Sequence, residues 1–453
     1  MMDKIKINIP DDVKYILNTI NKEGFDAYIV GGCVRDSIIG RKPLDWDITT
    51  NALPENVIDI FRKRQIKVIE TGLKHGTVTV VISNTSYEIT TFRIDSEYLD
   101  NRHPDKVTFT TSIQQDLSRR DFTINAMAYS ELTGILDYFN GMGDIDNKII
   151  RCVGKADERF NEDALRMLRA VRFSCQLGFN LEPAELLGSI KRNSHLVKNI
   201  SSERIRDELC KILMSYKPSK GIIDLYNCNL LSYIIPELIP CVDFDQRNIH
   251  HDKDIFKHTL SVVDCAPAEL DVRLAALLHD IGKVQCFTLD DKGQGHFYGH
   301  QKVSGDISRE ILKRLKFDNK TIESVSHLIY EHMRTCDTGK SLSVKKFINN
   351  VGVENLNNLF LLQIADRKSS AKKYSDFQDI LELKEKCRTI INEQIPLSLK
   401  DLNINGEDLI NIGIPRGKQI GIILNKLLEM ILKDPELNKK EILTDLAKKI
   451  NAL

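Results

Sequence analysis

The sequence predicts an α+β protein in which a head of short strands and helices precedes a long all-α part. Runs typical of β-strands occur only near the start, at 27–30 (AYIV), 77–82 (TVTVVI) and 87–92 (YEITTF). From about Asp157 onward, Leu and Ile recur every three or four residues, which is the spacing of amphipathic helices. Pro and Gly interrupt this helical pattern at 218–221, 235–240 and 413–417.

Length and composition limit the class of protein. A chain of 453 residues exceeds the size of one domain, so we expect two to four domains. Hydrophobic residues make up 42% and charged residues 28%, which argues against a disordered chain and against a membrane protein. The ten cysteines contain no Cys-x-x-Cys pair, and the charged N-terminal sequence has no apolar segment. These features predict a cytoplasmic protein without membrane contact.

The charge of the chain is balanced as a whole but uneven along its length. Lys+Arg and Asp+Glu are each 64, so the formal net charge is zero and gives no sign of a polyanionic partner. Residues 1–150, however, carry a net charge of −4, and residues 151–220 carry +5. The distribution predicts a carboxylate-bearing head suited to a cation and a basic segment suited to phosphates.

Two short motifs in the head predict a site for a phosphate and a metal. Gly31 and Gly32 follow an apolar strand, where they form a tight turn or let backbone N–H groups approach a phosphate. In a strand, Asp45 and Asp47 would lie on one face, where they form a solvated edge or hold a hard cation such as Mg²⁺. The two motifs together favour the metal site. Glu88 could add a third carboxylate or form a cross-strand ion pair.

Polar residues later in the chain supply further candidates. Arg120, Asp121 and Asn125 could bind a phosphate and ribose hydroxyls, or begin a solvated helix. In a helix, Asp163 and Arg166 would be neighbours three residues apart, which predicts either a hydrogen-bonding edge for a base or a surface ion pair.

Histidines and carboxylates in the middle of the chain predict a second metal site. His258, the adjacent pair His279-Asp280 and the distant Asp366 lie on successive predicted helices and offer imidazole and carboxylate ligands. Three more histidines could recruit a second metal, although lone histidines are usually core or surface groups: His300, His327 and His332.

These motifs resemble those of the class II tRNA nucleotidyltransferases, the CCA-adding enzymes and bacterial poly(A) polymerases of the polymerase-β superfamily. The resemblance rests on GGCVRDSIIGRKPLDWDITT, RRDFTINAMAY, LDYFNGMGDIDNKIIRCVG and RFNEDALRMLRAVRF. The histidine pattern, with LAALLHDIGK, resembles the HD phosphohydrolase superfamily. Together the resemblances imply a polymerase-β-like nucleotidyltransferase head with a small mixed sheet at 1–145, a neck at 146–240, an HD domain at 241–375 and a helical tail at 376–453.

The resemblance implies roles for individual residues. Asp45 and Asp47 would hold two Mg²⁺ ions, and Gly31, Gly32 and Arg35 would face the triphosphate. Arg120, Asp121 and Asn125 would recognise the ribose. Asp163 and Arg166, assisted by Arg169, would replace a nucleic-acid template in selecting C and then A, and the segment 202–209 would brace that helix, although Ser202 could be an ordinary N-cap. His258, His279, Asp280 and Asp366 would be the HD metal ligands.

The implied function is addition of the 3′-terminal CCA to tRNA from CTP and ATP, by a monomer or weak dimer. The complete loop with Asp95, Asp100, Arg102 and Pro104 favours full CCA addition over an A-adding enzyme, and the absence of basic extensions disfavours a poly(A) polymerase. A rival of another class is an HD phosphohydrolase with an RNA-binding head.

The HD site would use Mn²⁺, Ni²⁺ or Co²⁺ to hydrolyse a phosphomonoester or 2′,3′-cyclic phosphate, or it would serve only as structure. A loop with Gly413, Arg416, Gly417 and Lys418 would hold the tRNA elbow or simply cap a helix.

Overall fold

The computed structural model describes residues 6–70, 72–95, 107–248 and 252–451. The chain forms two compact units, Met1–Pro236 and Glu237–Leu453. Within the described residues, no helix combines the length and the apolar character needed to span a membrane. The α+β prediction is confirmed, because strands concentrate in the first unit and helices dominate the rest.

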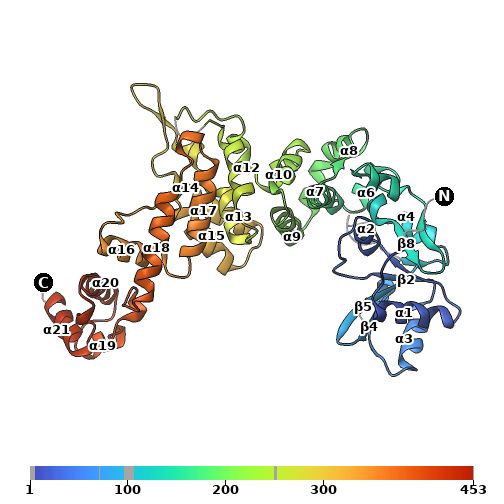
Figure 1. Cartoon of the computed structure of the whole chain (residues 1–453), viewed down its shortest axis with the longest axis horizontal. Helices are drawn as coiled ribbons and strands as arrows, with labels where there is room; N and C mark the ends of the chain where they lie inside the picture. Colours follow the sequence, from blue (N-terminus) through green and yellow to red (C-terminus); the bar gives the residue numbers. More distant parts are fainter. Residues whose placement is uncertain (1–5, 71, 96–106, 249–251, 452–453) are drawn as a thin grey trace. The chain divides into compact units, whose positions relative to one another are not determined.

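A seven-stranded mixed sheet organises the start of the first unit (Figure 1). The strand order is β3-β4-β5-β2-β1-β8-β9, and the β2–β5 pair is parallel whereas the other neighbours are antiparallel. The strands predicted at 27–30 and 77–82 have these bounds in the structure. The strand predicted at 87–92 spans 85–91. The strands are β1 (Ala27–Val30), β2 (Ile48–Thr50), β3 (Lys67–Ile69), β4 (Thr77–Ile82), β5 (Thr85–Thr91), β8 (Met127–Ser130) and β9 (Gly134–Asp137), with β6 (Arg93–Asp95) and β7 (Val107–Phe109) paired separately.

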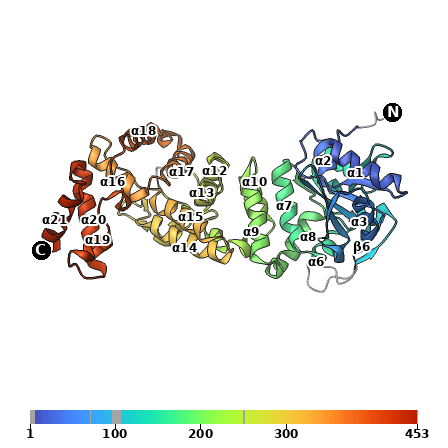
Figure 2. The same cartoon turned by 90° about the horizontal axis from the view of Figure 1, so that it is seen from below.

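Short helices flank this sheet and bring the motifs to it. All four residues of β1 are buried, so the strand fixes the position of the turn at Gly31 that follows it. The core beside β1 contains Tyr28, Val30, Phe92 and Leu117, and burying these side chains stabilises the sheet. The helices are α1 (Asp11–Lys22), α2 (Gly32–Ile38), α3 (Pro54–Arg62), α4 (Ile113–Ser118) and α5 (Gly141–Asp146), of which α1 to α3 are labelled in Figure 2.

Helices complete the first unit. The predicted continuous helix around Asp163 is wrong, because α6 ends at Glu162 and α7 begins at Leu165. Asp163 has an extended backbone (φ −143°, ψ 104°), and its Oδ1 accepts a hydrogen bond from the N–H of Leu165 at 3.0 Å. A short carboxylate can replace helical hydrogen bonds in this way. The elements are β10 (Ile149–Ile150), α6 (Ala156–Glu162), α7 (Leu165–Leu177), β11 (Asn180–Leu181), α8 (Leu186–Asn193), α9 (Ser202–Leu213), α10 (Pro218–Asn227) and α11 (Leu231–Ile234).

The second unit is almost entirely helical. Helices α12, α13, α15 and α17 pack together, and α14 packs on α15. One short hairpin, β12 (Thr288–Leu289) with β13 (Gly295–His296), precedes α14. The helices are α12 (Ile255–Cys265), α13 (Leu270–Leu278), α14 (His300–Arg314), α15 (Asn319–Glu331), α16 (Ser341–Val351), α17 (Leu356–Ser369), α18 (Gln378–Asn392), α19 (Gly406–Asn411), α20 (Lys418–Lys433) and α21 (Lys440–Asn451).

Candidate functional site

The paired carboxylates of the head lie just before a strand. The prediction that Asp45 and Asp47 belong to a strand is wrong, because β2 begins at Ile48. Pro43 and the aspartates themselves disfavour a strand here. The carbonyl of Asp47 nevertheless accepts a hydrogen bond from the N–H of Val30 at 3.0 Å, so Asp47 is tied to the end of β1.

The electrostatics of Asp47 suit a bound cation. Asp47 is exposed, yet the protein around its carboxylate still desolvates it and raises its pKa. Arg120 opposes this shift, and the like charge of Asp45 adds to it. A divalent cation between the two carboxylates would remove their repulsion, so the donor set fits Mg²⁺.

Register places Glu88 beside this pair in the sheet. Ile48 on β2 lies opposite Ile89 on β5 in a parallel pair, so the preceding residues, Asp47 and Glu88, occupy neighbouring positions. On the other side, Glu88 lies opposite Thr79 of β4 rather than a basic residue. Within the described residues no ion pair involves Glu88, so a cross-strand ion pair is not formed there. A metal role for Glu88 stays a prediction.

The turn at Gly31 lies against Arg120. Gly31 has φ +81°, a left-handed conformation that glycine adopts without strain, and a Cβ there would lie 2.8 Å from Nη1 of Arg120. Among the described residues, the buried Nε of Arg120 has no hydrogen-bond partner. An unsatisfied guanidinium nitrogen beside a glycine turn suits a phosphate oxygen.

Four predicted residues form one continuous network. Nη1 of Arg35 donates to Oδ1 of Asn125 at 2.5 Å, and Nδ2 of Asn125 donates to Oδ1 of Asp121 at 3.2 Å. Oδ2 of Asp121 accepts from Nε and Nη2 of Arg169 at 2.8 and 2.6 Å. The network thus joins α2, the segment before β8 and α7, and it fixes each polar group without a ligand.

Asp121 is the negatively charged residue of this network. Burial acts to raise its pKa, but the charge and hydrogen bonds of Arg169, with help from Arg166 and Asn125, outweigh burial and lower the pKa to about 2. Asp121 is therefore ionised at any pH near neutrality and acts as an anchor for Arg169 rather than as a proton carrier.

Asp163 and Arg166 are not paired with each other. Asp163 instead accepts hydrogen bonds from Nη1 and Nη2 of Arg204 on α9, at 3.3 and 2.9 Å. Arg166 pairs with Glu162 at 2.7 Å and donates to the carbonyl of Arg119. The surface ion pair between Asp163 and Arg166 is therefore wrong, and the segment that includes Arg204 braces Asp163 directly. Ser202 is the first residue of α9, and its N-cap is Ser201.

The sequence interpretation missed an aromatic support inside this site. Phe173 of α7 is buried, and the guanidinium carbons of Arg35, Arg169 and Arg172 lie 5.0, 5.4 and 4.0 Å from its ring centre. Arg172 is held in turn by the buried Glu208 of α9, 2.5 Å from its Nε. The spacing of Arg166, Arg169 and Arg172, three residues apart along one helix, could have indicated a guanidinium cluster, but no sequence signal indicated Phe173.

The HD ligand set gathers at one buried point of the second unit. Nε2 of His258 lies 2.9 Å from Oδ1 of Asp366, and Nε2 of His279 lies 3.2 Å from Oδ2 of Asp280. His258, His279 and Asp280 offer ligand atoms within 4.8 Å of one another. Asp280 and His300 form a second group with His332 in the same way. The predicted residues therefore converge, with Asp280 common to both groups.

The hydrogen bonds of the imidazoles fit metal binding. The Nδ1 atoms of His279, His300 and His332 lie 2.6 to 2.9 Å from backbone carbonyls, which can only accept. Nδ1 therefore donates, and Nε2 keeps a lone pair for a metal. Within the described residues, the buried Nε2 of His332 has no hydrogen-bond partner, and the Nε2 atoms of His279 and His300 face oxygens of Asp280 at 3.2 and 3.4 Å. His327 differs, because its Nε2 lies 2.8 Å from the carbonyl of Val351 and outside both groups.

Charges around the HD site are strongly coupled. Burial acts to lower the pKa of His279, but Asp280 and Asp366 outweigh burial and raise it. The pKa of Asp280 lies well below its usual range, because His279 and Lys283 outweigh its burial. Nζ of Lys283 lies 2.8 Å from Oδ2 of Asp280.

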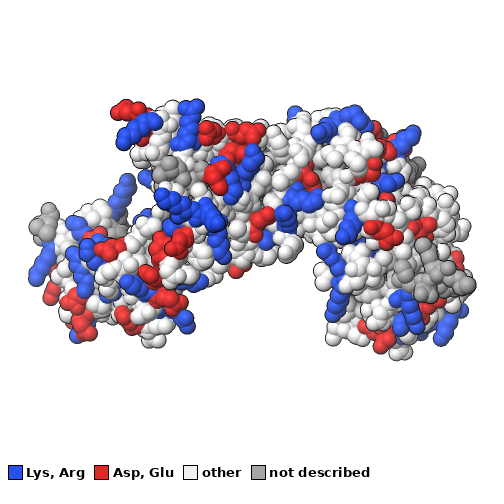
Figure 3. All heavy atoms as spheres, turned by 45° about the horizontal axis from the view of Figure 1, so that its top comes forward, with Lys and Arg blue, Asp and Glu red and all other residues white. Residues whose placement is uncertain are grey.

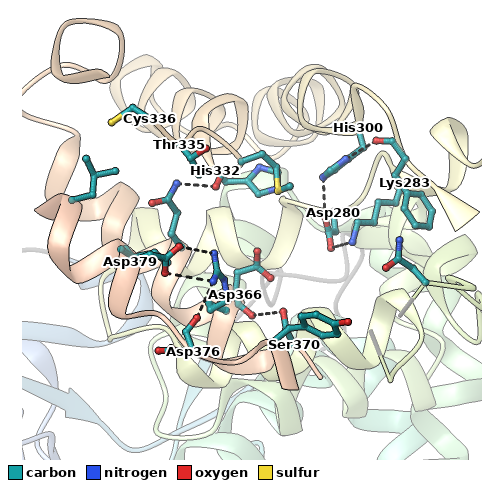
Figure 4. Close-up of a pocket in the computed structure, with 18 of the residues that line it drawn as sticks. Asp280, Lys283, His300, His332, Thr335, Cys336, Asp366, Ser370, Asp376 and Asp379 are labelled. Atoms are coloured by element: carbon teal, nitrogen blue, oxygen red, sulfur yellow. Dashed lines mark hydrogen bonds and ion pairs between the residues drawn. The ribbon is translucent and has the colours of Figure 1, made fainter. Parts of the chain in front are cut away.

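A cavity of about 780 Å³ opens onto these residues (Figure 4). Asp280, Lys283 and His300 converge at one part of its wall, and Asp366 and Ser370 lie at another. Arg367 also lines the cavity, where it is paired with Asp379. The cavity therefore offers both charged and apolar groups and is large enough for a small phosphate ester.

Two predicted regions have simpler outcomes. Gly413 and Gly417 have left-handed φ values of +92° and +146°, and Gly417 directly precedes α20, so the predicted loop into a helix is present. Asp95 ends β6, whereas Asp100, Arg102 and Pro104 lie outside the described residues.

On the face drawn in Figure 3, basic and acidic side chains are intermixed.

Comparisons with known proteins agree with this geometry. Residues 27–151 match the Poly A polymerase head domain, residues 178–241 match a probable RNA and SrmB-binding site of polymerase A, and residues 255–371 match the HD domain. A CCA-adding enzyme of Ligilactobacillus salivarius is 36% identical over 450 residues, covering 98% of each chain. A CCA-adding enzyme of Pediococcus pentosaceus is 34% identical, covering 97% of this chain and 98% of the relative.

Solved structures give the same result. The Bacillus stearothermophilus CCA-adding enzyme in complex with CTP is 29% identical, covers 98% of this chain and 99% of its own, and has a TM-score of 0.73. The Thermotoga maritima CCA-adding enzyme complexed with tRNA is 21% identical with a TM-score of 0.58, covering 98% of this chain and 96% of its own, and supports the fold alone.

Proposed function

The chain belongs to the family of CCA-adding enzymes, and on this premise we propose that its first unit adds the 3′-terminal CCA of tRNA from CTP and ATP. Asp45 and Asp47 would hold Mg²⁺, which when bound would activate the primer hydroxyl and offset charge on the phosphates. We expect the enzyme in the cytoplasm as a monomer or weak dimer.

The network from Arg35 to Arg169 is the observation that carries this proposal. It holds Asn125 and Asp121 in fixed orientations, where they can bind ribose hydroxyls. Arg120, which lies against the turn at Gly31, would bind a phosphate through its guanidinium group. Arg35 and Arg169 would orient the nucleotide. Fixed donors and acceptors lower the cost of aligning the triphosphate with the primer.

Base selection is proposed for the neighbouring helix α7. Asp163 offers a carboxylate and Arg166 offers guanidinium N–H groups, which together can match the hydrogen-bonding edge of C or A. Because Arg204 fixes Asp163 and Glu162 fixes Arg166, each group is oriented independently.

An incorporation assay tests this function. tRNA lacking CCA is incubated with separately labelled CTP and ATP, and both labels should enter the product. Incorporation of ATP alone, and only on CC-ended tRNA, would identify an A-adding enzyme, and repeated addition of AMP would identify a poly(A) polymerase. No incorporation would contradict the proposal. Asp47→Asn should reduce incorporation by about 1,000-fold or more, as expected for loss of a catalytic metal ligand. Asp59→Asn, an exposed carboxylate on α3, is the matched control and should retain activity.

We further propose that the second unit hydrolyses a phosphomonoester or 2′,3′-cyclic phosphate. The support is the ligand set His258, His279, Asp280 and Asp366, together with the available Nε2 atoms beside it. A divalent cation held there would supply the electrophilic assistance that phosphate-ester hydrolysis requires. Lys283, already bonded to Asp280, would help to bind the phosphate.

Product assays test the hydrolase. The full chain is incubated with adenosine 2′,3′-cyclic phosphate and with 3′-phosphorylated tRNA in the presence of Mn²⁺, Ni²⁺ or Co²⁺. Hydrolysis of the cyclic ester opens the ring to a 2′- or 3′-monoester, which is measured by chromatography, and hydrolysis of the 3′-monoester releases inorganic phosphate. We expect turnover that His279→Ala abolishes and that His327→Gln, with its ring bonded to a carbonyl away from the site, retains. No turnover of either substrate with any of the three metals would restrict the HD fold to a structural role.

A further inference from the structure

A stacked aromatic pair lies at the wall of the HD cavity and is not needed for metal binding. The rings of His296 and Tyr298 are nearly parallel, with an interplanar angle of 6° and a centroid distance of 5.3 Å. Both residues line the cavity, and Tyr298 is 78% exposed. Such exposure is unusual for a tyrosine that borders a cavity containing a candidate hydrolytic centre.

The pair is held firmly in place. Nε2 of His296 lies 3.2 Å from Oδ2 of Asp290, and Oδ1 of Asp290 accepts N–H groups from Lys292 and Gln294 in the turn between β12 and β13. The Tyr298 hydroxyl lies 3.4 Å from Nδ1 of His296. A stacking surface that is fixed beforehand loses little conformational entropy when it binds a ligand.

An aromatic anchor joins the pair to the catalytic end of the cavity. Phe297, between the two stacked residues, packs against Phe287 at 5.5 Å, and Nζ of Lys283 lies 5.2 Å from its ring centre. Lys283 also contacts Asp280. On the other side of Tyr298, the left-handed Gly299 leads directly to His300 at the start of α14. Tyr298 thus lies two residues before His300, and its neighbour Phe297 contacts Lys283, which is bonded to Asp280.

We propose that Tyr298, supported by His296, is a stacking platform for the nucleobase of the substrate hydrolysed at the HD site. The inference rests on the proposed hydrolase function and names the residue that would hold the base of its substrate, a ribonucleoside bearing a 2′- or 3′-phosphate, either free or at the end of an RNA. An exposed aromatic ring stacks on any base through its π-face and discriminates little among bases. The phosphate would lie toward Lys283 and Asp280, and the base toward Tyr298.

Kinetics with and without a base test the platform. Full-length wild type, Tyr298→Ala and Tyr298→Phe are compared on adenosine 2′,3′-cyclic phosphate and on methyl riboside 2′,3′-cyclic phosphate, with Mn²⁺. Because stacking contributes about 1–3 kcal/mol, Tyr298→Ala should raise the KM for the adenosine substrate about tenfold with little change in kcat. Its KM for the methyl riboside should not change, and Tyr298→Phe should match wild type.

Controls separate the platform from general damage. Tyr216→Ala removes another exposed tyrosine, 98% exposed and in the first unit, and should leave both KM values unchanged. If Tyr298→Ala weakens both substrates equally, or neither, the platform is wrong. A minihelix RNA ending in a 2′,3′-cyclic phosphate identifies the source: a raised KM for it assigns an RNA end, and a raised KM for the mononucleotide alone assigns a free nucleotide.

Binding distinguishes failure of the platform from failure of the hydrolase. If wild type releases no product from either substrate, the proposed hydrolysis fails, but titration calorimetry with adenosine 3′-phosphate still reports on the platform. Affinity about tenfold weaker in Tyr298→Ala than in wild type would support stacking. Equal affinity in the two proteins, or no binding by wild type, would overturn it.

Discussion

The nucleotide network of the head and the HD cluster of the second unit satisfy their charged groups in opposite ways. In the head, Asp121 is already paired with Arg169 and Asn125, so the protein itself supplies the partners. In the HD cluster, the buried Nε2 of His332 has no hydrogen-bond partner among the described residues, and that of His300 faces only the Asp280 carboxylate, at 3.4 Å. The charged groups of the head network are paired without a ligand, whereas the imidazole nitrogens of the HD cluster would gain a partner when a cation binds.

This difference has an energetic consequence for each region. A buried ion pair is costly to break, because removing one partner leaves the other charge unsatisfied. Buried nitrogens without partners carry a cost that a bound cation would relieve. The head should therefore respond mainly to substitutions within its network, and the HD cluster mainly to the removal of metal.

The largest effect should come from breaking the head network. Asp121→Asn keeps the shape of the side chain but removes the charge that holds Arg169. Breaking a buried pair costs about 3–5 kcal/mol of stability, and here less because the Arg169 side chain is 34% exposed. Because Arg169 and Asn125 would also lose their fixed orientation toward the nucleotide, incorporation kcat/KM should fall on the order of 100-fold. Steady-state incorporation assays measure this. Unchanged phosphate release from the second unit is the control, and normal incorporation would show that the network is not needed.

Metal removal should have the next largest effect on stability, and mainly in the second unit, because the Arg35–Arg169 network of the head is formed without a cation. With Mn²⁺ at about 100 times its Kd, chelation should remove about 3 kcal/mol of stability from that unit. Hydrogen exchange of the full chain measures this: amides of α12 and α13 should lose protection, while those of β1 and β8 should not change.

Histidine variants make the metal experiment specific. His279→Ala should exchange at the same rate with and without Mn²⁺, because it lacks a candidate ligand. His327→Gln should behave like wild type, since its ring is bonded to the carbonyl of Val351. Equal loss of protection in both units on chelation would mean that the metal acts elsewhere.

A smaller effect is expected at the brace between α7 and α9. In a double-mutant cycle, Asp163→Ala and Arg204→Ala should show a coupling of about 1–2 kcal/mol in the free energy of unfolding, because the pair is mostly buried. Asp163→Ala should also weaken the discrimination between CTP and ATP more than total binding of tRNA. Unchanged discrimination would leave Asp163 with a purely structural role.

The sequence predicted the residues of both sites better than their contacts. Gly31, Asp121 and the His279-Asp280 pair were found because each lies in a short motif whose chemistry can be inferred locally. The partner of Asp163 was missed, because Arg204 is 41 residues away and meets it only through the packing of α7 on α9. Phe173 was missed for a different reason. A single buried aromatic residue in a helix has no motif that distinguishes it from other core residues.

Helix geometry explains which of the extra histidines join the HD cluster. His327 and His332 are five residues apart along and just beyond α15, which corresponds to a rotation of about 140° around a helix. They therefore lie on different sides of the helix and could not both reach one site. Only the packing of α15 against α13 decides that His332 faces His279, whose ring centre lies 5.3 Å away.

The smallest predicted effect concerns the pH dependence of the head. The pKa of Asp121 is lowered to about 2, because Arg169 outweighs the burial that would raise it. A depressed pKa adds stability that is present above the unfolded value near 3.8 and is lost as the pH falls toward 2. Between pH 6 and pH 3 wild type should lose about 1 kcal/mol of this contribution, and Asp121→Asn should not. Urea unfolding of both proteins, with Asp59→Asn as the exposed control, measures the difference. A gap between wild type and Asp121→Asn that stays constant over this range would mean that Asp121 titrates like an ordinary carboxylate, and the contrast between a head with its own partners and a second unit that relies on a metal would lose its electrostatic basis.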